Sequence, residues 1–274
     1  MVARMVLRAK RDQVLNCDIH ATTQARPWRC RKDVIRMICS SLMLLAAMGA
    51  LGGETEKTDA EAWLREAELA YDRVTGYTTV LHKQQRVAGK LLPEETIFLK
   101  YRKPLSLYMK WIKAPYKGSE LLYVAGWNEN RIRAHRGGML RFITRNVDPR
   151  DPGLMAENLR PVTSIGMGYL LETVAINIRK ASKAGELAFS ERAQETVYGG
   201  NTQVLEVSFP KERVKEYDGR RFVINQHIET KILIRIRIYD QDDRLVENYG
   251  YENLNLEAPL TDADFDPKNP EYRF

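Results

Sequence analysis

Short runs of alternating apolar and polar residues follow one another through residues 96–138, and Pro, Gly and Asn residues separate them. Alternate side chains of a β-strand point to opposite faces, and the separating residues favour tight turns. In the central run one face carries Leu105, Leu107, Met109 and Trp111, and the other carries Ser106, Tyr108 and Lys110. The pattern predicts an antiparallel meander that forms a curved sheet. One face should meet a core or an apolar ligand, and the other should meet water or partners.

Two amphipathic helices are expected, one before and one after this meander. Thr58 and Glu61 have the spacing of a capping box, and apolar residues then recur at helical spacing as far as Gly76. The second helix is predicted over residues 167–181, and Gly185 has the position of a terminating glycine. Each helix therefore has one apolar face to bury.

Further strands complete the predicted fold. Residues 77–87 are rich in β-formers, residues 198–201 have the composition of a hairpin turn, and isoleucines alternate with charged residues in 231–239. After Phe142 the alternation gives way to a connection containing Pro and Gly at residues 146–168, with a short helix expected after Asp151. Helices combined with mainly consecutive strands indicate an α+β fold.

The first 52 residues differ in kind from the rest. An uncharged apolar run at 37–51 follows several basic residues, and it is shorter than the ~20 apolar residues that a spanning helix needs. We predict a signal peptide over residues 34–52, with an uncleaved signal anchor as the alternative. Residues 1–33 are expected to be an unstructured basic extension, consistent with a start codon assigned too far upstream. Residues 53–274 are then one exported domain in the periplasm or cell envelope.

Removing this leader changes the meaning of the charge. It contains nine Lys or Arg and three Asp or Glu, so without it the net charge falls from +7 to +1. A basic excess confined to the leader does not indicate a nucleic-acid partner. All three cysteines also precede residue 53, so the predicted domain has no disulfide.

The domain contains no familiar catalytic motif. We find no Gly-x-Ser-x-Gly elbow, no phosphate-binding glycine loop and no dinucleotide fingerprint. The histidines after residue 52 lie far apart in the sequence, and they are His82, His135 and His227. We therefore predict a non-enzymatic protein without a cofactor or a metal. Scattered acids such as Glu94, Glu95 and Glu120 leave an envelope hydrolase as one further hypothesis. Near the C-terminus, Phe265 is expected to anchor a polar segment to the body.

Three blocks of sequence resemble a known family. They are KQQRVAGKLLPEE at residues 83–95, KYRKPLSLYMKWIKAPYKGSELLYVAG at 100–126 and DADFDPKNPEYRF at 262–274. In this order they resemble the exported bacterial family called domain of unknown function 1571 (DUF1571), over roughly residues 59–274. Gln85 departs from the pattern, which has an acidic residue at that position.

This family looks related to the periplasmic lipoprotein carriers of the LolA and LolB type. The relationship implies a strongly curved, unclosed half-barrel with helices covering its concave side, and an apolar cavity that receives acyl chains. The partner would then be an acyl chain, a lipid or a lipoprotein, with membrane association only transient or through the leader. From the apolar pattern, the predicted lining is Leu107, Met109, Trp111, Tyr123, Ile234 and Ile236, with Met167, Leu170 and Leu171 from a helical lid.

The apolar strand faces also fit an ordinary filled core. In that alternative the protein is an interaction module for an envelope protein partner. The partner would dock on an aromatic rim made of Tyr108, Trp111, Tyr116, Tyr123 and Trp127.

Overall fold

The computed structural model describes residues 52–274. The predicted basic extension at 1–33 and the signal-peptide segment up to residue 51 lie outside the described residues. In the part of the chain that is described, no helix combines the length and the apolar character needed to cross a membrane.

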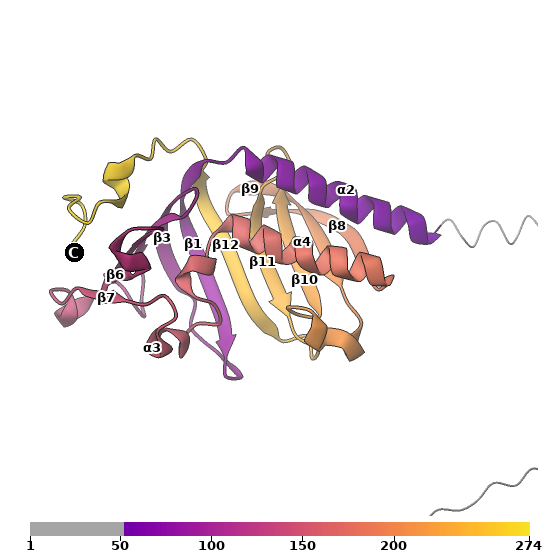
Figure 1. Ribbon diagram of the computed structural model, residues 1–274. Coiled ribbons are helices and arrows are strands. Elements are labelled where there is room, and N and C mark those ends of the chain that lie inside the picture. Colours follow the sequence, from indigo (N-terminus) through magenta and orange to yellow (C-terminus); the bar gives the residue numbers. More distant parts are fainter. Residues whose placement is uncertain (1–51) are drawn as a thin grey trace, which may run out of the picture. The chain divides into compact units, whose positions relative to one another are not determined.

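One antiparallel sheet of twelve strands dominates the fold (Figure 1). The strands in chain order are β1 (Gly76–Val87), β2 (Lys90–Leu91), β3 (Glu95–Arg102), β4 (Ser106–Trp111), β5 (Glu120–Val124), β6 (Ile132–His135), β7 (Arg145–Val147), β8 (Ala188–Val197), β9 (Gly200–Ser208), β10 (Arg221–His227), β11 (Leu233–Tyr239) and β12 (Leu245–Asn255). Their order across the sheet is β7-β6-β5-β4-β3-β1-β12-β11-β10-β9-β8, with β2 paired only to β1. Because β7 and β8 remain as separate edges, the sheet does not close into a barrel.

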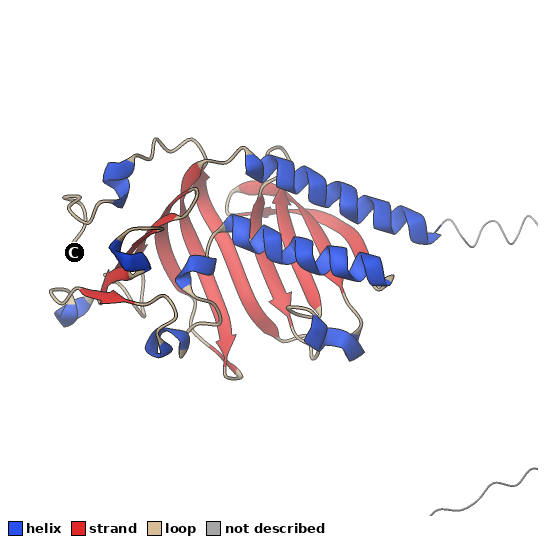
Figure 2. Cartoon of the chain, viewed as in Figure 1, coloured by secondary structure: helices blue, strands red, loops and turns tan. Residues whose placement is uncertain are grey.

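Two long helices, α2 (Gly52–Asp72) and α4 (Met167–Ala184), lie side by side over the same face of the sheet (Figure 2). The short elements are α3 (Pro152–Met155), η1 (Asn128–Asn130), η2 (Gly138–Leu140), η3 (Val162–Ser164), η4 (Lys211–Glu216) and η5 (Asp262–Phe265). The sheet curves around the two long helices, so this face is its concave side. The predicted fold class, an α+β protein with an unclosed, curved antiparallel sheet covered by helices, is confirmed.

The helix ends show where local sequence signals were sufficient. Gly185 terminates α4 in the left-handed conformation, with φ of 70°, as predicted. The short helix expected after Asp151 is present as α3, and Asp151 caps it by accepting hydrogen bonds from two backbone N–H groups. The predicted start of the first helix is wrong, because α2 begins at Gly52 and Thr58 lies inside it. Glu54, Glu56 and Lys57 are good helix formers, so they favour extension of the helix past the apparent capping box.

The main core fills the space between the concave face and the two helices. Alternate residues of β4 and β11, such as Leu107 and Ile236, are almost fully buried in it. The Tyr77 ring stacks on Tyr101 with centroids 4.9 Å apart, and its hydroxyl accepts a hydrogen bond from the Met167 N–H at 3.2 Å. This contact fixes the first turn of α4 against β1 and β3.

The convex face of β4 is covered by the C-terminal strap, residues 261–274. Tyr108 is 2% exposed, and its ring stacks on Tyr272 with centroids 3.7 Å apart. Phe265 is buried in the same cluster, so its predicted role as an anchor is confirmed. The prediction that the Tyr108 face meets water or partners is wrong for Tyr108, because a segment more than 150 residues later in the same chain returns to cover it.

An ion pair holds this strap at Lys100 and Asp264, whose Nζ and Oδ1 atoms are 2.9 Å apart. Burial opposes the charge of Asp264. Hydrogen bonds from Lys100 and from the Thr261 backbone outweigh that effect, so the pKa of Asp264 lies below its ordinary value.

We expect the strap to loosen in acid. The ionised Asp264 stabilises the fold fully above the ordinary Asp pKa of about 3.9, and this contribution is lost as the pH falls through the lower folded value. Below about pH 4, the free energy of unfolding should therefore fall more steeply in the wild-type protein than in Asp264→Asn. Urea unfolding at a series of pH values measures this. The prediction would be wrong if the free energy of unfolding fell equally steeply with pH in the two proteins.

Candidate functional site

A cavity of about 630 Å³ lies at the β4–β7 end of the concave face, between the sheet and residues 149–165. Its volume is within the range of ~300–1,000 Å³ that is typical of small-molecule sites. Much of the lining is apolar, and this part, which we call the apolar wall, comes from both the sheet and the connection: Met109, Leu121, Ile132, Ala134, Leu154, Val162 and Ile165. The residues at the rim are exposed, and they include Arg136, Leu140, Ile143, Arg145 and Glu157. The cavity is therefore an apolar pocket that is open to solvent on one side.

The lining beside the apolar wall is polar, and we call it the polar wall, but its groups satisfy one another. Lys83 Nζ donates to Glu95 Oε1 and to Asn158 Oδ1, each at 2.6 Å. Trp111 Nε1 donates to Glu95 Oε2, also at 2.6 Å. Because the ammonium and carboxylate are paired, this wall can lie beside an apolar ligand without leaving an uncompensated buried charge.

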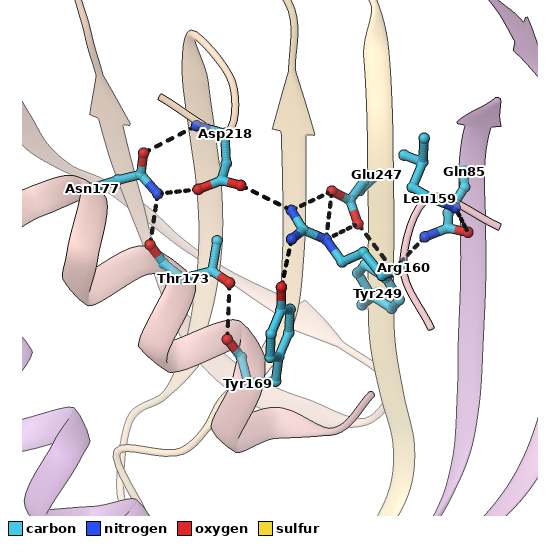
Figure 3. Close-up of polar contacts among 9 residues, drawn as sticks. All are labelled: Gln85, Leu159, Arg160, Tyr169, Thr173, Asn177, Asp218, Glu247 and Tyr249. Atoms are coloured by element: carbon cyan, nitrogen blue, oxygen red, sulfur yellow. Dashed lines mark hydrogen bonds and ion pairs between the residues drawn. The ribbon is translucent and has the colours of Figure 1, made fainter. Parts of the chain in front are cut away.

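The connection that closes the cavity is held in place by Arg160 (Figure 3). Its guanidinium donates to both carboxylate oxygens of Glu247, to Asp218 Oδ1 at 3.2 Å and to the Tyr169 hydroxyl at 2.7 Å. Burial disfavours the charge of Arg160, but the hydrogen bonds and charge of Glu247 outweigh burial and raise its pKa above the ordinary value. The ion pair with Glu247 joins the connection to β12. The contacts with Tyr169 and Asp218 join it to α4 and to the loop after η4.

The same network extends in two directions. Tyr249 donates to Glu247 at 2.9 Å and accepts from Gln85 at 2.6 Å, and Gln85 in turn accepts from the Leu159 backbone N–H. At the other end, Asn177 donates to Asp218 Oδ2 at 2.7 Å. Figure 3 shows these side chains converging on the segment around Arg160 from the sheet and from α4. The wall of the cavity is therefore fixed to rigid elements on both sides.

Glu120 and His135 form a second buried polar group beside the cavity. Glu120 is 1% exposed, and its Oε2 accepts a hydrogen bond from the Arg273 backbone N–H at 3.0 Å. Its Oε1 lies 3.4 Å from Lys110 Nζ. His135 donates from Nδ1 to the Arg136 carbonyl at 3.1 Å, and its Nε2 lies 3.7 Å from Glu120. Glu95 and Glu120, two acids considered for hydrolysis, thus both line the cavity with their carboxylates held by structural partners.

Two of the predicted lining residues, Met109 and Trp111, line the cavity. The remaining predicted residues lie in the main core, and they are Leu107, Tyr123, Ile234, Ile236, Met167, Leu170 and Leu171. The helix predicted as a lid, α4, packs on the core, and the connection before it closes the cavity instead. In the predicted aromatic rim, Tyr108 and Tyr123 are buried, so they do not offer an exposed docking surface.

Sequence reasoning missed the polar wall and the Arg160 network. The sequence identified residues 146–168 only as a long connection of a kind that is often functional. Lys83 and Glu95 stand on different strands, and the register that pairs these two residues across β1 and β3 is not encoded in either strand alone. Among residues 52–274, no cluster of three or more His, Cys, Asp or Glu residues is arranged to hold a metal.

The unclosed curved sheet and its covering helices define an α+β protein with a cavity between the sheet and a fixed connection. The family model described as protein of unknown function (DUF1571) matches residues 74–274. The chain therefore belongs to this family, and the resemblance predicted from the three sequence blocks is confirmed. No curated protein matches the chain.

Several solved structures are similar to the chain at low sequence identity. For the lipoprotein LppX of Mycobacterium tuberculosis the TM-score is 0.46 at 14% identity, covering 76% of this chain and 99% of that one. A LolA superfamily protein from Nitrosomonas europaea gives 0.33 at 10% identity, covering 76% and 97%. MucB gives 0.42 at 15% identity and 76% coverage, and the chain spans 62% of MucB, which is less than two thirds of its length.

Proposed function

We propose that the protein binds the acyl chain of a lipid or of an acylated protein in the cavity beside β4–β7. The observation that carries this proposal is an open cavity of about 630 Å³ with an apolar wall. A filled core, which is the structural basis of the interaction-module alternative, would leave no such space. We further propose that residues 53–274 act as one exported domain in the periplasm or envelope, which rests on the basic and apolar leader.

The chemistry of the walls indicates how such a ligand would lie. The acyl chain would cover Met109, Ile132 and Ile165, where each buried methylene contributes ~0.8 kcal/mol. The paired Lys83 and Glu95 would flank the chain without requiring a polar partner from it. The polar end of the ligand would then lie at the exposed rim, where Arg136 and Arg145 supply positive charge.

We expect affinity for fatty acids to increase with chain length. Each added methylene should tighten binding roughly fourfold while the cavity is being filled, because ~0.8 kcal/mol is gained per methylene. Longer chains should give no further gain once the apolar wall is covered. Isothermal titration with a series of saturated fatty acids measures this, and burial of the chain should give a negative heat-capacity change.

A variant that fills the cavity provides the control. Ala134→Trp places a large side chain in the cavity and should weaken binding by more than tenfold, whereas Ala156→Trp, on the exposed side of the connection, should not. Urea unfolding of both variants checks that the fold is retained. If no fatty acid or acyl peptide binds the wild type, or if Ala134→Trp binds equally well, the proposal is wrong.

A further inference from the structure

The loop between β6 and β7 exposes an unusual cluster of apolar side chains. Met139 is 95% exposed and Phe142 is 80% exposed, while Leu140 and Ile143 are about half exposed. The described residues expose eight large apolar side chains, and four of them lie within the five positions 139–143. Single exposed apolar residues are common, but a contiguous group marks an interaction surface. We call residues 138–145 the apolar tip.

The apolar tip lies in a strongly basic segment. Residues 131–147 contain five arginines and no acidic residue, and the arginines are Arg131, Arg133, Arg136, Arg141 and Arg145. Of these five arginines, only Arg131 lies within 4 Å of a carboxylate of the described residues, that of Glu129. The Arg141 guanidinium lies over the Phe142 ring, 4.7 Å from its centroid. Positive charge and apolar surface are therefore combined in one exposed segment.

The apolar tip also forms part of the cavity rim. Leu140 and Ile143 line the cavity, together with Arg136 and Arg145, whereas Met139 and Phe142 are not among its lining residues and are the most exposed of the group. The same segment thus has one set of side chains facing the cavity and another facing solvent. Whatever surface Met139 and Phe142 contact is placed next to the cavity mouth.

We propose that the apolar tip docks on a bilayer that contains anionic phospholipids. Met139 and Phe142 enter the boundary between headgroups and acyl chains, and the arginines bind the lipid phosphates, as in other interfacial membrane anchors. A bilayer fits better than a protein groove because the exposed apolar residues lie in η2 and the turn that follows it, with basic residues on both sides and no acid among them. An anionic surface is complementary to such a segment over its whole length.

Docking of the tip goes beyond the proposed acyl binding and does not require it. The two combine simply, because a docked tip turns the cavity mouth toward the bilayer, from which an acyl chain can enter without crossing water. Each of the two proposals can also be refuted without refuting the other. Fatty-acid binding by Met139→Ser should match the wild type even if the tip is essential for membrane contact.

A tryptophan at the tip tests the proposal with the full chain. Phe142→Trp is mixed with vesicles of phosphatidylglycerol carrying bromine on their acyl chains, which quench tryptophans that enter the bilayer. The matched control is Ile176→Trp, at a position of α4 that is 57% exposed. Because the leader is identical in both proteins, any contact that it makes with the vesicles affects both equally.

We expect the additional fluorescence of Trp at position 142 to be quenched by anionic vesicles, and that of Trp at position 176 to be unaffected. Neutral phosphatidylcholine vesicles with the same bromine content should quench position 142 much less. Adding Arg141→Gln and Arg145→Gln should reduce quenching by the anionic vesicles to that neutral level. Absence of quenching at position 142, equal quenching at both positions, or quenching that does not depend on lipid charge and arginine would each overturn the proposal. The first of these results would favour a protein partner.

Discussion

Replacing Arg160 with methionine should lower the free energy of unfolding by about 3–5 kcal/mol, the typical cost of removing one partner of a buried ion pair. Glu247 has only 3% of its side chain exposed, and Arg160 is the sole cation paired with it in residues 52–274. The Tyr249 hydroxyl would still donate to Glu247, but the carboxylate would lose its counter-charge. Urea denaturation followed by circular dichroism measures the loss.

Two further variants separate this effect from a general effect of losing arginine. Arg179→Met removes a surface pair with Glu68, and it should cost at most about 1 kcal/mol. In the double variant Arg160→Met with Glu247→Gln, most of the lost stability should return, because no unpaired charge remains buried. Equal losses in Arg160→Met and Arg179→Met would show that the buried network does not hold the cavity wall.

The sequence was sufficient for features that depend on local periodicity. The alternation around Met109 and the isoleucines of β11 predicted which side chains point toward the core, because a strand places every second residue on the same face. The end of α4 at Gly185 followed from one residue that tolerates the left-handed conformation. The same reasoning failed at Tyr108, because the partner that buries it, Tyr272, lies far away in the chain.

In the candidate site, too, the sequence predicted features set by local periodicity and missed contacts between distant segments. Met109 and Trp111 were predicted to line a cavity, and they do, because they lie on the concave face where the connection stands away from the sheet. The polar wall could not be predicted in this way. Lys83 meets Asn158 across 75 residues of sequence, and Arg160 meets Glu247 across 87. Pairs at such separations depend on the completed fold, and no local spacing encodes them.

Tyr272→Ala should be the other strongly destabilising change, with a loss of about 3 kcal/mol or more in the free energy of unfolding. The Tyr272 ring covers Tyr108, and its hydroxyl donates to the Asp264 carbonyl at 2.5 Å. Lys100 Nζ also lies 5.4 Å from the ring centroid, so the substitution removes a cation–π contact beside the Lys100–Asp264 pair. The same urea denaturation measures the loss.

Lys268→Ala, on the exposed part of the strap, is the matched control and should change stability by less than about 0.5 kcal/mol. The strap covers the convex face, whereas the cavity opens on the concave face. Tyr272→Ala should therefore expose apolar surface on the convex face, and Lys268→Ala should not. Tyr272→Ala should bind a hydrophobic fluorescent probe at Tyr108 and Leu122 even when Ala134→Trp has filled the cavity. If probe binding by Tyr272→Ala disappeared on filling the cavity, the convex face would not be the surface that the strap protects.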